Sequence, residues 1–247
     1  MPIKPDNKHP LEHFRKRKGK ISYLIIHCSR SNPQRQIEIM QENGVSAHYI
    51  IGRNGNLTEV IPQKDVAYHA GISSWHNSEG QSLNETSIGI ELECPTMGQI
   101  KRSYFKNQIN KLIDILKQLQ ELYSIRKDHI LAHSDIAPMR KPDPGAWFPW
   151  KKLYQAGITF WYDERRLSKE TDEKKLLAII GYNTENLSAA RYAFCRRWLP
   201  QEVPEDKDMQ HLLDFPFPPD FTPKNPKNYQ KRLRAVAKAI EEVRRKG

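Results

Sequence analysis

Two histidines and one aspartate stand where the expected backbone would hold a side chain firmly. His27 and His133 each close a short apolar run that predicts a buried strand, and Asp143 lies between two prolines in a rigid turn. Two imidazoles, one carboxylate and a water molecule make a catalytic zinc site with one open position. Taken singly, a histidine at a strand end is more often structural, and Pro-Asp-Pro-Gly is more often a surface turn. The zinc hypothesis therefore requires the three side chains to converge.

Carboxylates on another expected strand and one lysine could complete such a site. Residues 87–93 alternate in polarity, so that Glu91 and Glu93 share one face of the strand. A carboxylate buried there would have its pKa raised toward a value useful for proton transfer, whereas on an edge strand it would simply face water. Lys141, two residues before Asp143, could stabilise negative charge on a substrate oxygen, although a surface lysine needs no such role.

Strands and helices are mixed along the first two thirds of the chain. The apolar runs 47–51 and 57–61 flank Asn54-Gly55, which is a strong hairpin signal. Apolar residues at helical spacing predict a helix over residues 104–123. Together with the three strands described above, these elements predict an α/β domain with a mixed central sheet flanked by helices.

The last third of the chain differs in composition. The charged stretch at residues 159–171 predicts a linker. Helical patterns follow at residues 173–180, 187–198 and 228–245, and Phe215–Pro219 predicts an extended proline-rich loop. Three such helices can form a small bundle. We therefore expect three parts: a basic N-terminal segment (1–19), an α/β domain (20–167) and a small three-helix domain (168–247).

The net charge of +11 favours an anionic partner, such as nucleic acid, anionic lipid or a carboxylate-rich cell-wall polymer. Dense basic runs at residues 15–18 and 244–246 contribute to this charge, and we expect both runs to be solvated. No nucleic-acid-binding motif accompanies them, so the nucleic-acid alternative has only the charge in its favour.

The cysteines and the N-terminus bear on the cellular compartment. Cys28, Cys94 and Cys195 are widely spaced and include no CxxC pair, so we expect reduced thiols rather than disulfides. The N-terminus lacks the apolar core of a secretory signal, and no apolar run is long enough to span a membrane. We expect a cytoplasmic protein, or a periplasmic or envelope protein if a signal has been removed from this sequence.

Six motifs occur in an order and spacing typical of one enzyme family. They are His27, Val45–Ile51, Ala67–Gly71, Ser87–Glu91, Ala132–Pro138 and Lys141–Gly145. In them the chain resembles the type-2 N-acetylmuramoyl-L-alanine amidases, zinc enzymes that share a fold with phage amidase lysozymes and peptidoglycan recognition proteins. The resemblance covers about residues 20–155. It implies hydrolysis of the bond between N-acetylmuramic acid and L-alanine in peptidoglycan or in muropeptides, including the 1,6-anhydro form.

The resemblance also implies roles for particular residues. The implied zinc ligands are His27, His133 and Asp143, the implied catalytic carboxylate is Glu91, and Lys141 is implied to assist at the oxyanion. We expect His48 and His69 to bind substrate or to support the ligands. The phage lysozymes have a cysteine as the third ligand, so Asp143 favours the bacterial subgroup.

The C-terminal region resembles a small three-helix peptidoglycan-binding-like domain found in some of these amidases, through residues 177–182 and 189–194. That pattern has glutamine after Phe194, where this chain has Cys195. Because the region lies beyond every zinc motif, we expect it not to supply the chemistry. The alternative to an enzyme is a non-catalytic peptidoglycan recognition module, which loss of the zinc ligands would indicate; all three positions are filled here.

Overall fold

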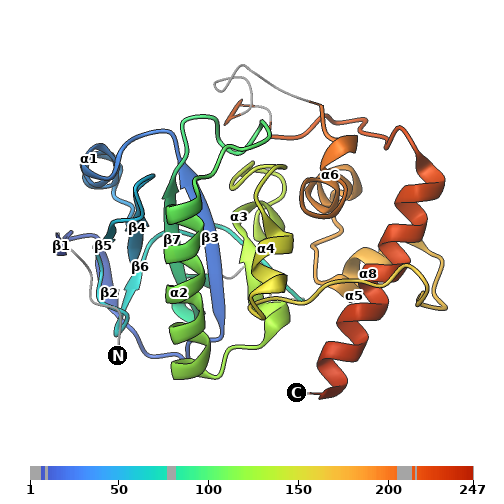
Figure 1. Cartoon of the computed structure of the whole chain (residues 1–247), viewed down its shortest axis with the longest axis horizontal. Helices are drawn as coiled ribbons and strands as arrows, with labels where there is room; N and C mark the ends of the chain where they lie inside the picture. Colours follow the sequence, from blue (N-terminus) through green and yellow to red (C-terminus); the bar gives the residue numbers. More distant parts are fainter. Residues whose placement is uncertain (1–6, 9–10, 77–81, 205–212, 215, 247) are drawn as a thin grey trace.

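A six-stranded mixed sheet forms the centre of the protein (Figure 1). The computed structural model describes residues 7–8, 11–76, 82–204, 213–214 and 216–246. The sheet consists, in spatial order, of β1 (Asn7–Lys8), β5 (Leu57–Glu59), β4 (Tyr49–Ile51), β7 (Ser87–Glu93), β3 (Tyr23–Ser29) and β8 (Ile130–Ala132). β3 is parallel to both β7 and β8, whereas β5 is antiparallel to β4. The mixed sheet predicted from the sequence is confirmed.

The predicted hairpin joins β4 to β5 through the turn at Asn54-Gly55. Gly55 has a φ of +92°, which glycine adopts without steric cost because it has no β-carbon.

Helices flank the sheet on both faces. They are α1 (Pro33–Asn43), α2 (Lys106–Tyr123), α3 (His133–Ile136), α4 (Trp150–Gln155), α5 (Glu173–Ile180), α6 (Leu187–Trp198) and α8 (Pro226–Lys246), with short 3₁₀ turns η1 (Leu83–Thr86), η2 (Lys127–His129) and η3 (Pro200–Glu202). The bounds of α5 and α6 agree with the sequence prediction residue for residue. In the part of the chain that the structure describes, no helix has the length and apolar character that crossing a membrane requires.

The two faces of the sheet have different partners. Leu24 and Ile26 of β3 pack with Ile88 of β7 and with α2, which Figure 1 shows across the near face. Successive side chains of a strand point to opposite faces, so Ile25 and His27 lie on the other face. Ile25 indeed belongs to a second core, formed with the C-terminal helices.

The C-terminal helices share that second core with the sheet. Ile25 and Leu131 pack in one apolar cluster with Leu177 of α5, Phe194 of α6 and Val236 of α8. The boundary between a catalytic and a helical domain near residue 167 stays a prediction, but the two parts are in continuous apolar contact.

Residues 159–171, expected to form a linker, are packed instead. Phe160 is buried in the second core, and its ring lies 5.4 Å from that of Trp198. Glu164 accepts hydrogen bonds from Arg232 and Lys231 of α8. The charges that suggested a solvated linker therefore pair with the charges of a helix that follows much later in the chain.

The N-terminal basic run was also expected to be solvated, and for Arg17 this is wrong. Residues 14–16 form β2 (Phe14–Lys16), which pairs with β6 (Asp65–Ala67) in a small antiparallel sheet. The Arg17 guanidinium then donates to the carbonyl oxygens of Gln63, Asp65 and Ser87 at 3.2, 2.9 and 3.0 Å. A single basic side chain thus ties the N-terminal segment to the central sheet.

All three cysteines are buried and free, as expected, and Cys195 is a core residue of α6. Of the predicted proline-rich loop, Phe215 lies outside the described residues.

Candidate metal centre and active site

His27 and His133 come together because their strands are neighbours. β3 and β8 are parallel and adjacent, so the segments that leave their carboxyl ends lie side by side. His27 is on β3, and His133 follows β8 directly as the first residue of α3. The backbone N–H of Ser134 donates to the carbonyl of Asp143 at 2.9 Å, which fixes the aspartate loop against α3.

The three predicted ligands converge. His27 Nδ1 lies 2.9 Å from His133 Nδ1 and 3.4 Å from Asp143 Oδ2, and His133 Nδ1 lies 3.1 Å from the same oxygen. At most 5% of each residue is exposed, so water cannot easily separate them. Among the described residues, these three form the one cluster of this type whose donor atoms all lie within 4.8 Å.

Hydrogen bonds on the far side of His27 determine where its proton lies. Ser87 Oγ donates to the carbonyl of Leu83 at 2.6 Å, so it accepts from His69 Nε2–H at 3.2 Å. His69 Nδ1 is then an acceptor, and His27 Nε2–H donates to it at 3.0 Å. The lone pair of His27 Nδ1 therefore faces the cluster.

His133 is oriented in the same way. Its Nε2 lies 3.3 Å from the carbonyl oxygen of Ala70, which can only accept, so Nε2 carries the proton and Nδ1 carries the lone pair. Burial, followed by the neighbouring His133, lowers the pKa of His27 to about 4, which keeps its ring neutral.

The cluster thus turns two imidazole nitrogens and one carboxylate oxygen toward one another, within 3.4 Å. Such an arrangement is repulsive unless a cation lies among the three atoms. Two neutral imidazoles and a carboxylate are a donor set that Zn²⁺ accepts, with room for a fourth ligand. The outer hydrogen bonds of both rings are of the kind that orients metal-binding histidines. The residues present therefore fit a zinc ion.

Glu91 lies beside this cluster. It pairs in register with His27 on the adjacent parallel strand and lines the same cleft. Its Oε2 is buried and has no hydrogen-bond partner in the described part of the chain. Burial, with a smaller contribution from the charge of Asp143, raises the pKa of Glu91 to about 8. Glu93 is different, because its carboxylate accepts from the backbone N–H of Arg53 at 3.2 Å and does not line the cleft.

The cleft has a volume of about 420 Å³ and gathers six of the seven predicted site residues. Its lining includes His27, His69, Glu91, His133, Lys141 and Asp143, with Met40, Val45 and Met97 as apolar walls and Arg30 as a basic group. Lys141 is half-buried and lies two residues before Asp143.

The remaining predicted residue, His48, is not in the cleft lining. It is fully buried, and its Nδ1 accepts from the backbone N–H of Gly89 at 3.0 Å. Its Nε2 lies 3.1 Å from Arg17 Nη2 and 3.2 Å from the Asp65 carbonyl. The structure places it behind the site, between β7 and the N-terminal segment.

Sequence reasoning missed Arg17 and Ser87. Nothing distinguishes Arg17 from the three basic residues around it, since the backbone carbonyls that it bonds are distant in the sequence. Ser87 did carry a signal, because it shares a strand face with Gly89 and Glu91. Gly89 is required there, since a β-carbon would collide with the His69 ring.

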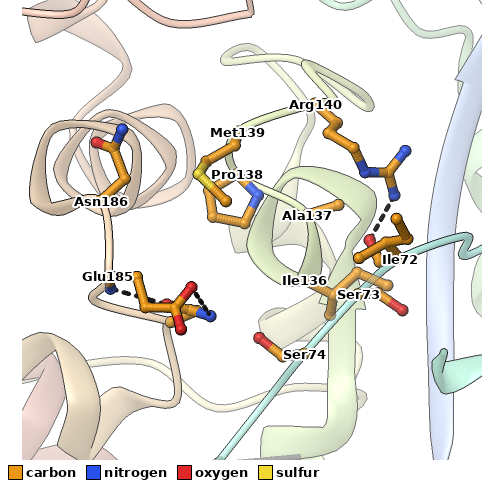
Figure 2. A pocket seen from close by; sticks show the side chains of 11 residues that line it. Ile72, Ser73, Ser74, Ile136, Ala137, Pro138, Met139, Arg140, Glu185 and Asn186 are labelled. Atoms are coloured by element: carbon orange, nitrogen blue, oxygen red, sulfur yellow. Dashed lines mark hydrogen bonds between the residues drawn. The ribbon is translucent and has the colours of Figure 1, made fainter. Parts of the chain in front are cut away.

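A second hollow of about 240 Å³ is lined by residues 72–74, residues 136–140 and the loop between α5 and α6 (Figure 2). Figure 2 shows Arg140 reaching toward the backbone beside Ile72. Arg140 Nη2 also donates to the carbonyl of Ala70 at 3.1 Å, the same carbonyl that orients His133. Among the described residues, no histidine or cysteine lines this hollow, in contrast to the larger cleft.

Comparison with known proteins agrees with this site. Residues 17–146 match the family described as N-acetylmuramoyl-L-alanine amidase. The chain is 37% identical to N-acetylmuramoyl-L-alanine amidase AmiD of Escherichia coli K12 over 163 residues, which are 60% of this chain and 58% of AmiD. It is 38% identical to 1,6-anhydro-N-acetylmuramyl-L-alanine amidase AmpD of Haemophilus influenzae over 109 residues, 44% of this chain and 56% of AmpD. The chain thus spans less than two thirds of the length of these curated relatives.

Solved structures extend the similarity across most of the chain. E. coli AmiD in complex with the substrate anhydro-N-acetylmuramic acid-L-Ala-D-gamma-Glu-L-Lys has a TM-score of 0.68 and 26% identity, covering 91% of this chain and 90% of that one. AmpDh3 from Pseudomonas aeruginosa has a TM-score of 0.70 at 22% identity, with 91% and 92% covered, and shows a shared fold. Because the matched family covers more than half of the sequence, the chain belongs to the type-2 N-acetylmuramoyl-L-alanine amidases.

Proposed function

We propose that this protein is a zinc-dependent amidase that hydrolyses the bond between the lactyl carbonyl of N-acetylmuramic acid and the L-alanine of the stem peptide. One observation carries the proposal. Two oriented imidazole lone pairs and a buried carboxylate meet on the wall of a cleft, beside a glutamate that has an unpartnered buried oxygen. A module that only recognised peptidoglycan would need neither the ligand set nor the glutamate.

His27, His133 and Asp143 would hold the zinc ion. When bound, zinc supplies Lewis acidity, which lowers the pKa of water and polarises a carbonyl. His69 is assigned to support His27 through the Nε2–H hydrogen bond, rather than to contact substrate alone. His48 is assigned to the support of β7 through Gly89, since it lies outside the cleft lining.

Glu91 is assigned as the proton carrier. It accepts a proton from the attacking water and returns it to the leaving nitrogen of L-alanine. In the absence of a bound cation, the pKa of Glu91 is about 8, so its carboxyl group can hold a proton near neutral pH and donate it to the leaving nitrogen. A dication bound nearby would favour the carboxylate form and so provide the base for the first step.

Lys141 is assigned to the carbonyl oxygen of the scissile amide. Its ammonium group would stabilise the negative charge that develops there as water attacks. The cleft volume of about 420 Å³ is in the range of small-ligand sites, which suits one sugar with the first residues of its peptide. The carboxylates of a stem peptide also complement the net charge of +11.

The proposal is tested by product analysis. The purified zinc-loaded protein is incubated with a soluble 1,6-anhydromuropeptide and, separately, with intact sacculi, and the products are analysed by mass spectrometry. We expect a free stem peptide that begins with L-alanine and an intact amino sugar. Binding of the muropeptide without any cleavage would instead support the non-catalytic recognition module.

A further inference from the structure

The last turn of α6 carries two arginines that are buried although their charges need solvation. Arg196 is 1% exposed and Arg197 is 6% exposed. Both side chains contact the part of the chain that carries the proposed ligands. Figure 1 shows α6 beside α3. Two buried cations at one helix end require specific partners, because an unpaired buried charge is strongly destabilising.

Arg197 contacts the base of α3. Its Nη1 forms an ion pair with Asp135, and its Nη2 donates to the carbonyl of Ile130 at 3.0 Å. Its guanidinium plane lies 3.9 Å from the ring centroid of Trp150. The planar fork of arginine satisfies a carboxylate and a carbonyl at once, which a lysine cannot do in the same geometry.

Asp135 connects Arg197 to the backbone beside His133, one of the proposed metal ligands. It is fully buried, and its Oδ2 accepts from the backbone N–H of Ala132, the residue that precedes His133. Its Oδ1 accepts from the hydroxyl of Tyr182, which follows α5, at 2.7 Å. α3 has only four residues, so this carboxylate determines where the helix starts and therefore where the His133 ring lies.

Arg196 contacts the second half of the site. Its Nη1 donates to the carbonyl of Lys141 at 3.5 Å, and its Nη2 donates to the carbonyl of Pro216. The guanidinium is held over the ring of Tyr192 at 4.4 Å from the centroid. The same helix end thus touches both segments that supply groups to the cleft, one through Asp135 and the other through the backbone of Lys141.

We propose that the C-terminal end of α6 is a positioning element of the active site: Arg197, through Asp135, fixes His133, and Arg196 fixes the loop that carries Lys141 and Asp143. This inference rests on the proposed zinc function. It makes the C-terminal helices a structural part of the metal centre, although they would still supply no reacting group.

The test uses the full-length protein and two conservative variants. Arg197→Lys keeps the charge but removes the fork, and Tyr182→Phe removes one hydrogen bond from Asp135. The matched control is Arg191→Gln on the same helix, because Arg191 bonds Glu173 and the carbonyl of Phe221, both within the C-terminal region. For each protein, the zinc dissociation constant is measured by competition with a chromophoric chelator, together with kcat, KM and Tm.

We expect Arg197→Lys to raise the zinc dissociation constant about tenfold or more, the range found for groups that orient metal ligands. Tyr182→Phe should raise it by a smaller factor, and both should lower kcat more than they change KM. Arg191→Gln should lower Tm and leave zinc affinity unchanged. If Arg197→Lys does not fold, Tyr182→Phe decides alone.

Zinc affinity and kcat within twofold of wild type in every folded variant would overturn the proposal, leaving the arginines a purely stabilising role. That result would leave the proposed function intact, because zinc binding and cleavage by the wild-type protein are measured in the same series.

Discussion

Glu91 and Glu93 lie two residues apart on one strand, yet their carboxylates have different surroundings. Glu91 lines the cleft and has a buried oxygen without a partner, whereas Glu93 is bonded to the backbone of the turn at Arg53. A carboxylate left without partners is costly to bury, and this cost is characteristic of a group kept for chemistry. The alternation in the sequence predicted that both side chains would share a face. It could not distinguish their surroundings, because these depend on the turn between β4 and β5.

We predict that Glu91→Gln lowers kcat about 10²- to 10⁴-fold, since it removes the proton carrier while keeping the shape of the side chain. Zinc content should stay that of the wild type. Glu93→Gln is the matched control, and its kcat should change little. A large loss of kcat in Glu93→Gln, with nearly normal kcat in Glu91→Gln, would contradict the assignment.

The same substitution should change the pH dependence of stability in the metal-free protein. The pKa of Glu91 is raised from 4.5 to about 8, so the folded protein keeps a proton that the unfolded chain releases across this window. Stability associated with this group is therefore present below pH 4.5 and is lost as pH rises toward 8. Glutamine does not titrate, so the Glu91→Gln protein avoids that loss. Its free energy of unfolding should gain on that of the wild type by about a few kcal/mol as pH rises from 5 to 8, because a pKa shift is coupled to stability. Denaturant unfolding at both pH values measures the gap, and a gap that does not grow would contradict the shift.

Among the elements, β7 contributes three alternate positions on one face, and each position has a different role. Ser87 ends the hydrogen-bond chain from His27, Gly89 leaves space for the His69 ring, and Glu91 faces the cleft. The period-2 pattern of this strand predicted that these side chains share a face. It could not predict the hydrogen bonds that link Ser87, His69 and His27, because His69 comes from a loop whose path depends on the whole sheet.

We predict that Ser87→Ala weakens zinc binding about 10- to 100-fold, because His69 loses the acceptor that fixes its tautomer and, with it, the orientation of His27. The control is Ser168→Ala, another buried serine, whose hydroxyl bonds Glu241; neither residue lines the cleft. Chelator competition on both variants gives the zinc dissociation constants. Equal zinc affinity in the two variants would show that the hydrogen bonds from Ser87 through His69 do not orient His27.

Helix bounds illustrate what local sequence can and cannot predict. α5 and α6 have the predicted ends because Asp172 and Asn186 cap their first turns and Gly181 ends α5, all of which are local signals. β2 and β6 were not predicted, since two three-residue strands are defined mainly by pairing with each other. Arg17 was judged solvated for the same reason: its partners are distant in sequence.

At the scale of the molecule, the C-terminal helices complete the apolar core behind the sheet. Ile25 and Leu131 are buried against them, and two arginines of α6 reach the ligand loops. Motif order alone suggested a separable domain, because motifs mark the residues that do chemistry and not those that hold them. Long-range packing therefore changes the expectation for a truncated chain.

We predict that a chain ending at Glu170 loses both solubility and zinc affinity, because it exposes apolar side chains such as Leu131 and leaves Asp135 without Arg197. Soluble yield, Tm and the zinc dissociation constant are compared with those of the full chain. A folded, zinc-loaded truncation that cleaves soluble muropeptide at the full rate would show that the helices are dispensable.

We propose that His27, His133 and Asp143 hold a zinc ion that the cleavage requires. The most direct measurement is turnover of a soluble 1,6-anhydromuropeptide by metal-stripped protein as zinc is added in known equivalents. We expect no turnover without metal, a linear rise, and saturation at about one zinc ion per chain, with Asp143→Ala inactive throughout at the same zinc concentrations. Full turnover by the metal-stripped protein, or none at saturating zinc, would contradict it.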